Sequence, residues 1–134
     1  MTIQVHNMEG FPPPPPGASH VSVATGNQLI HVAGQTGTDK AGAVLDGLAA
    51  QTDQAFRNIA SALDEAGATP ADLVKLTAYV VDWDMSKLEE LITGGREART
   101  DLSFPDVPIT LIGVTSLFTP DMLVEIEAVA VLES

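Results

Sequence analysis

Apolar and polar residues alternate with a period of two in several short stretches, which is the pattern of β-strands with one buried face. Residues 21–24 and 29–33 alternate on either side of Thr25-Gly26-Asn27-Gln28, a sequence typical of a turn, and together they predict a β-hairpin. Residues 76–81 are rich in β-branched and aromatic side chains and predict a third strand. The apolar stretches 109–114 and 123–132 predict two long C-terminal strands joined by a turn at Thr119-Pro120-Asp121.

Two segments change to the spacing of three and four residues that is typical of an amphipathic helix. In the first segment the apolar stripe comprises Leu48, Thr52, Ala55, Phe56, Ile59, Ala62 and Leu63. Gly67 and Pro70 mark the end of this helix. The second helix is expected to begin at Ser86-Lys87-Leu88-Glu89, which has the spacing of a capping box, and to end at Gly94-Gly95 or continue frayed toward Arg99.

The order of elements is two strands, a helix, a strand, a helix and two strands, which predicts an α+β domain. Both helices would lie on one face of a mixed β-sheet, and association of identical subunits would cover the other face. The length of 134 residues fits a single domain over residues 18–134. Residues 1–17 end in a five-proline run and predict a stiff surface arm. Structural packing of this run is favoured over binding to a proline-recognition module, since no basic residue flanks it.

The net charge of the chain excludes some classes of binding partner. Eighteen carboxylates face six basic residues, giving a net charge of −12. The negative surface repels phosphate backbones, so no nucleic acid partner is expected, and it disfavours small dianions. No Lys or Arg follows Arg99. Without cysteines the chain has neither disulfides nor thiolate metal sites.

The N-terminal residues lack the basic start and apolar run of a signal peptide, and no stretch reaches the length of a membrane span. We therefore expect a cytoplasmic protein with no membrane partner. The three histidines, His6, His20 and His31, are not spaced as a helical metal pair, so no metal site is expected.

Several polar residues remain as candidates. Glu125 and Glu127 share one face of a predicted strand, either lining a cleft or remaining solvated or paired at an interface. His31 is expected to be buried and hydrogen-bonded, with contact to a ligand as the alternative. Ser19-His20 is a poor nucleophile–base pair, because adjacent strand residues point to opposite faces. Gly34 and Gly113 either let the backbone bend or let a ligand approach it.

A set of short motifs in a specific order resembles the Rid (YjgF-type) family of reactive intermediate deaminases over about residues 17–132. The motifs are Ser19-His20-Val21, Gly34-Gln35, the helix from Gln51 to Gly67, Asp72-Leu73-Val74-Lys75-Leu76-Thr77, Pro108, Gly113-Val114 and Glu125-Ile126-Glu127-Ala128. The resemblance implies a chorismate-mutase-like trimer with three small-molecule clefts between neighbouring subunits. It also implies hydrolysis of imines or enamines to ketoacids and ammonia, without cofactor or metal.

By the same resemblance, Glu125 corresponds to the glutamate that orients the attacking water. Thr110 stands where the family has an arginine that binds the substrate carboxylate, and backbone groups at Gly34 and Ile112 would help to hold the ligand. Two further cleft positions differ from those of many members: Ala18 replaces a tyrosine and Ala33 a serine. Glu89 or Glu90 corresponds to an asparagine of the second helix.

The sequence therefore favours a Rid-type homotrimer that binds a small molecule but is not a standard 2-iminoacid deaminase. If it is an enzyme, we expect cofactor-independent hydrolysis or deamination of a neutral or cationic imine-like or carbonyl-like ligand, with Glu125 positioning water. The alternative is a non-catalytic metabolite-binding or scaffold protein. Ribonuclease activity, sometimes attributed to family members, conflicts with the net charge.

Overall fold

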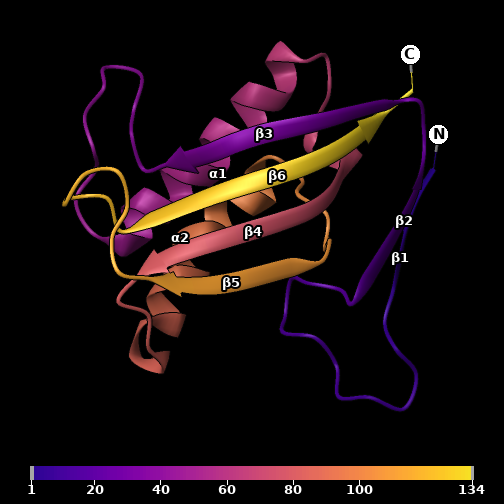
Figure 1. Cartoon of the computed structure of the whole chain (residues 1–134), viewed down its shortest axis with the longest axis horizontal. Helices are drawn as coiled ribbons and strands as arrows, with labels where there is room; N and C mark the ends of the chain where they lie inside the picture. The colour runs from indigo at the N-terminus through magenta and orange to yellow at the C-terminus, as the bar shows by residue number, and fades with distance from the viewer. Residues whose placement is uncertain (1, 134) are drawn as a thin grey trace.

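The computed structural model describes residues 2–133 and contains six strands and two α-helices in two layers (Figure 1). In chain order the elements are β1 (Thr2–His6), β2 (Val21–Thr25), β3 (Gln28–Thr36), α1 (Leu48–Glu65), β4 (Leu73–Val81), α2 (Leu88–Asp101), β5 (Ile109–Val114) and β6 (Val124–Leu132). Two short 3-10 turns, Pro70–Asp72 and Met85–Lys87, precede β4 and α2. The fold is α+β, as predicted.

The main sheet has the strand order β3-β6-β4-β5. β6 is antiparallel to both of its neighbours, whereas β4 and β5 run parallel, so the sheet is mixed. The two C-terminal strands therefore do not pair with each other, because β4 lies between them. A parallel pair needs a long crossover, and α2 provides it between β4 and β5.

The predicted N-terminal hairpin is wrong in its pairing. β2 pairs antiparallel with β1 in a separate two-stranded sheet, and β3 pairs with β6 instead. A turn signal identifies a change of direction but not the partner of the next strand. Residues 2–17 accordingly contain a strand as well as the proline run, since β1 precedes the run and lies beside β2 at the edge of the molecule (Figure 1).

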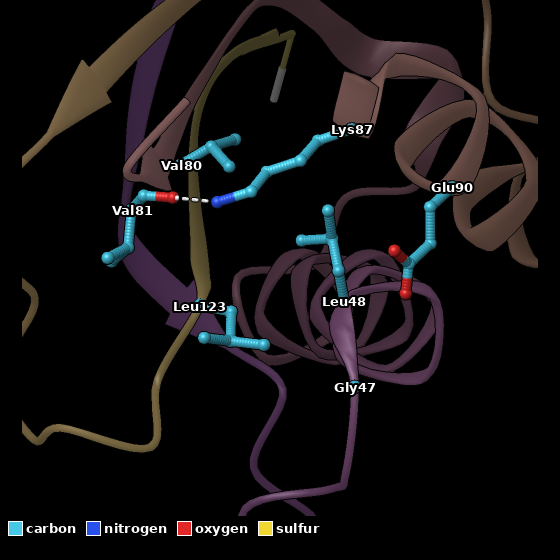
Figure 2. A pocket seen from close by; sticks show the side chains of 7 residues that line it. All are labelled: Gly47, Leu48, Val80, Val81, Lys87, Glu90 and Leu123. Atoms are coloured by element: carbon cyan, nitrogen blue, oxygen red, sulfur yellow. Dashed lines mark hydrogen bonds between the residues drawn. The ribbon is translucent and has the colours of Figure 1, made fainter. Parts of the chain in front are cut away.

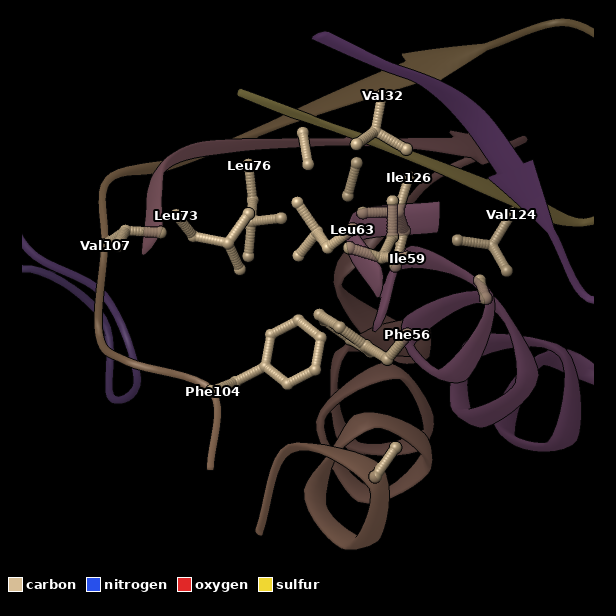
Figure 3. Close-up of a cluster of buried hydrophobic side chains, with 14 of the residues drawn as sticks. Val32, Phe56, Ile59, Leu63, Leu73, Leu76, Phe104, Val107, Val124 and Ile126 are labelled. Atoms are coloured by element: carbon tan, nitrogen blue, oxygen red, sulfur yellow. The ribbon is translucent and has the colours of Figure 1, made fainter. Parts of the chain in front are cut away.

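Both helices lie on one face of the main sheet, as predicted, and the face turned toward the viewer in Figure 1 carries no helix. The predicted stripe of α1 supplies most of its buried residues. Ile59 and Leu63 of α1 pack against Leu76 and Ile126 from the sheet, and Phe56 meets Phe104 edge to face at a ring-centroid distance of 5.2 Å (Figure 3). Burial of these apolar side chains is the main stabilising contribution.

The side chain of Gln51 is only 1% exposed and joins three segments. Its Nε2 donates to the carbonyls of Leu45 and Asp121 at 2.9 and 2.8 Å, and its Oε1 accepts from the backbone N–H of Leu123 at 2.8 Å. Each bond satisfies a polar group that would otherwise be buried without a partner. This amide therefore fixes the loops before α1 and before β6.

The start of α2 differs from the prediction, whereas its end agrees with the alternative that the helix continues past the two glycines. Asp84, not Ser86, begins the segment, because its carboxylate accepts from the N–H of Ser86 at 2.7 Å. Two residues, Gly94 and Gly95, lie inside the helix and are buried, and the helix continues to Asp101. A capping box is present elsewhere, at the 3-10 turn from Pro70, where Thr69 and Asp72 bond reciprocally.

Candidate functional site

The helix-free face of the main sheet carries most of the predicted site residues. Alternation along β6 turns Val124 and Ile126 into the core, so Glu125 and Glu127 both lie on the opposite, helix-free face. The same alternation places Lys75, Thr77 and Tyr79 of β4 on this face. Cross-strand register then aligns Thr77 with both Glu127 and Thr110. We call this surface the open face.

Glu125 lies directly against Gly34. A Cβ atom on Gly34 would be 2.5 Å from the carboxyl carbon of Glu125, which is far below a van der Waals contact. The glycine therefore leaves the space that the carboxylate occupies. The contact of Gly34 is therefore with a side chain of the same chain, and whether a ligand also approaches this glycine stays a prediction. The other glycine, Gly113, instead faces Trp83, whose Cβ would be 3.1 Å from an added methyl group.

Glu127 forms a specific bond to the neighbouring strand. The hydroxyl of Tyr79 donates to Oε1 of Glu127 at 2.5 Å. This bond to the carboxylate, followed by partial burial of the ring, raises the pKa of Tyr79 above its ordinary value, since both favour the neutral phenol. This bond lies within the chain and is not the interface pairing that the sequence suggested, and Glu127 also lines the cavity described below.

Thr110 lies exposed on β5, at the edge of the sheet. Its hydroxyl oxygen accepts a short hydrogen bond from the ammonium group of Lys75 on β4. Lys75 is half-buried and reaches the neighbouring strand diagonally, because Thr110 is paired with Thr77, two residues further along β4. A positive charge is thus present beside residue 110, although residue 110 itself has none.

A cavity of about 320 Å³ opens on the open face beside Lys75. It is lined by His31, Val32, Ala33, Lys75, Thr77, Glu127, Ala128 and Val129. The expectation that His31 is buried is wrong, because the residue is exposed on β3 and lines this cavity. The alternative contact of His31 with a ligand agrees with this location. The sequence signal was its place two residues before Ala33 on a strand.

The predicted site residues form two groups within one chain. Ala33, Gly34 and Glu125 cluster where β3 meets β6, whereas Thr110 and Ile112 lie on β5 at the opposite edge, with β4 between the groups. Ile112 is 40% exposed although it is large and apolar.

Ala18 belongs to neither group. It follows Gly17, whose carbonyl accepts from Arg99 of α2 at 2.7 Å, so its segment is held by the helical layer.

A second cavity, of about 220 Å³, lies away from these residues, between the start of α1 and the end of β4 (Figure 2). Lys87 closes one side by donating to the carbonyls of Val81 and Asp82 at 3.0 and 2.8 Å. Glu90 lines the other side and accepts from the N–H of Ala49 at 3.4 Å, whereas Glu89 is not among the lining residues. Glu90 therefore has a structural contact on the helical side.

Other chemistry that the sequence raised has no geometric support in the described part of the chain. Among residues 2–133, no group of three or more His, Asp or Glu side chains is arranged to hold a metal ion. His20 accepts at Nδ1 from the N–H of Met8, and the Ser19 hydroxyl is buried without a hydrogen-bond partner. No helix within these residues is long and apolar enough to cross a membrane.

Comparisons with known proteins agree on one family. The family model described as Endoribonuclease L-PSP matches residues 13–132. A RutC family protein of Pyrococcus abyssi is 32% identical over 125 residues, which cover 88% of this chain and 89% of the relative.

Among solved structures, the Rid family protein YyfB of Yersinia pestis is 34% identical with a TM-score of 0.86, covering 98% of this chain and all of that one. The YjgF protein of E. coli is 26% identical with a TM-score of 0.69, covering 96% and 98% of the two chains. The fold, the motif order and these relatives establish that the chain belongs to the Rid/YjgF superfamily, whose family model has the description Endoribonuclease L-PSP.

Proposed function

We propose that this protein is a cytoplasmic Rid-type homotrimer that binds a small imine-like or carbonyl-like molecule in clefts between subunits and hydrolyses it without a cofactor. The observation that carries the proposal is the position of Glu125. Its carboxylate is held over Gly34 on a sheet face that no helix covers, where it can accept a proton from a water molecule.

The division of the site residues between opposite edges of the sheet supports a cleft between subunits. Gly34 and Glu125 lie at one edge and Thr110 and Ile112 at the other, so a single chain does not bring them together. Packing of one copy's β5 edge against the β3–β6 edge of the next would complete the site. Each chain of a closed ring would then contribute to two clefts.

The chemistry needs only a positioned base and water. The water oxygen forms a bond to the carbon of the C=N group, the Glu125 carboxylate accepts the water proton, and the nitrogen takes up protons before the C–N bond breaks. The products are a carbonyl compound and ammonia. A positioned general base contributes roughly 10²-fold to 10⁴-fold to such a step.

Because residue 110 is a threonine, we do not expect this protein to act as a standard 2-iminoacid deaminase. A threonine hydroxyl cannot form the bidentate charged contact by which an arginine holds and orients a carboxylate. We therefore expect turnover of 2-aminoacrylate, generated in situ, to be far below that of arginine-bearing relatives. Comparable turnover would contradict this part of the proposal.

The proposal is tested by ammonia release from a panel of small imines and enamines generated in situ. Glu125→Gln keeps the shape of the side chain but removes the base, and should lower turnover at least about 100-fold. Glu127→Gln is the matched control two residues along the same strand, since Glu127 already bonds to Tyr79. Gly34→Ala should displace the Glu125 carboxylate and lower turnover without removing any functional group.

The alternative is a metabolite-binding or scaffold protein without catalysis. Thermal-shift screening separates the alternatives, because a ligand that binds only the native state raises the apparent stability. Stabilising ligands without turnover would favour the binding protein. Equally low turnover by the wild type and by Glu125→Gln would contradict a catalytic role for Glu125.

A further inference from the structure

The cavity of about 220 Å³ on the helical side lies apart from the open face (Figure 2). It shares no lining residue with the cavity on the open face. Its volume is below the roughly 300–1,000 Å³ of most ligand pockets, so only a small molecule fits. The lining combines one positive side chain, Lys87, and one negative side chain, Glu90, with apolar residues.

The apolar part of this lining belongs to the hydrophobic core or packs against it. Val80 of β4 is 1% exposed, Leu48 of α1 is 5% exposed, and Leu123, just before β6, packs against the same core. Close packing holds these side chains in fixed positions. Together they form an aliphatic surface that favours an aliphatic group on the ligand, because contact between the two removes apolar area from water.

Lys87 is fixed on one side of the cavity by two hydrogen bonds. Its ammonium group donates to the carbonyls of Val81 and Asp82 at 3.0 and 2.8 Å. An ammonium group has three N–H donors, so one donor and the positive charge remain for a ligand. Because the side chain is already held in place, a ligand that binds here does not have to order it.

Glu90 lines the cavity from α2 and has only a weak contact within the chain. Its Oε1 accepts from the N–H of Ala49 at 3.4 Å, which is longer than a typical N–H···O hydrogen bond. Within residues 2–133 its carboxylate accepts no other hydrogen bond. The second oxygen and the negative charge are therefore available to a donor on a ligand.

Lys87 and Glu90 do not neutralise each other, although they lie three residues apart. Side chains of opposite charge at this spacing commonly pair on a helix surface. In the described part of the chain these two form no ion pair, because Lys87 is directed toward Val81 and Glu90 toward the start of α1 (Figure 2). The cavity therefore presents a positive and a negative group at different places on its wall.

A zwitterion matches this lining better than a molecule with one charge. The net charge of −12 disfavours an anion, and Lys87 repels a cation. We propose that the cavity is a second ligand site, which binds a small aliphatic α-amino acid with its carboxylate at Lys87, its ammonium group at Glu90 and its side chain against Leu48 and Val80. This site goes beyond the proposed function, since it uses none of the residues of the open face.

The test compares L-valine with two analogues that each lack one charged group, 3-methylbutanoate and 2-methylpropylamine, by ligand-observed NMR and calorimetry on the full chain. The wild type should bind valine about tenfold to a hundredfold more tightly than either analogue, because each analogue loses one charge-assisted contact. Glu90→Gln should weaken valine binding by the same factor and leave 3-methylbutanoate binding unchanged. Glu89→Gln, at an exposed neighbour outside the lining, is the matched control and should bind valine like the wild type.

Equal affinity of the wild type for valine and both analogues, or valine binding that is unchanged in Glu90→Gln, would overturn the assignment. Loss of valine binding in Glu125→Gln would also overturn it, by placing the ligand on the open face. Lys87→Met should remove the preference for valine over 2-methylpropylamine. Because this change also releases two carbonyls, urea denaturation checks its fold, and Glu90→Gln, which keeps the side-chain shape, decides the test if Lys87→Met is unfolded. Valine has no C=N group, so these measurements are independent of turnover and their failure leaves the proposed hydrolysis untouched.

Discussion

Tyr79 is the single tyrosine of the chain, so its ionisation can be followed without interference from another phenol. Its hydroxyl donates to Glu127, which favours the neutral phenol and raises its pKa above 10.0. A raised pKa in the folded state contributes stability that is fully present below the unfolded pKa of about 10 and is lost as the pH rises through the folded pKa.

We predict that absorbance titration of the native protein gives a Tyr79 pKa above 10.0, and that Glu127→Gln lowers it toward that value. Glu125→Gln should lower it much less, because Glu125 acts only through a weaker coulombic effect. An unchanged titration curve in Glu127→Gln would show that the hydrogen bond is not formed in solution.

Contacts of this kind could be foreseen only in part. The same-face relation of Glu125 and Glu127 follows from strand alternation, and the sequence predicted it. The bond of Lys75 to Thr110 depends on which strands are neighbours and on a parallel register, and neither is encoded within either segment. The exposure of His31 was missed for a related reason: alternation places it on a face but does not reveal that no helix covers that face.

At the scale of elements, periodicity located five of the six described strands and both helices but missed β1, and the pairing of the strands was set by tertiary structure. β2 and β3 are adjacent in sequence and separated by a turn, yet they belong to different sheets. The extent of α2 was likewise set by packing. Gly94 is unfavourable for a helix in isolation, but here it allows α2 to approach α1 closely.

This close approach yields a prediction about stability. A Cβ on Gly94 would lie 2.5 Å from the backbone oxygen of Ala49 on α1, so Gly94→Ala should destabilise the fold by about 2 kcal/mol despite the better helix propensity of alanine. Gly95→Ala should cost less, because its nearest neighbour is a side-chain atom of Phe56 at 2.9 Å and not backbone at 2.5 Å. Urea denaturation measures both, with Thr93→Ala as the exposed control. Stabilisation by Gly94→Ala would mean that the helices are farther apart than described.

At the scale of the whole molecule, the open face is the surface that we expect to bind other copies of the chain. It exposes Leu29 and Ile112 together with the half-buried carboxylates, and no element of the same chain covers it. The proposed function requires association of copies at the β5 and β3–β6 edges of this face. The family resemblance of the sequence motifs implies a trimer, and the proposed cleft between subunits would bring together the two sheet edges that one chain keeps apart.

Assembly can be tested by mixing variants. Glu125→Gln disables one half of the proposed cleft and Ile112→Trp fills the other half, so each homotrimer should be inactive. Mixed trimers formed by co-expression should regain part of the wild-type turnover, because some clefts receive both intact halves. Separately purified variants combined without subunit exchange are the control. No recovery in verified mixed trimers would place the whole site within one subunit.

The buried amide of Gln51 has a consequence for how this protein can vary through evolution. Its side chain donates hydrogen bonds to the backbone carbonyls of Leu45 and Asp121. A change in the length of either loop, before α1 or before β6, would therefore break one of these bonds. Insertions and deletions among relatives that keep this glutamine should therefore accumulate outside these two loops.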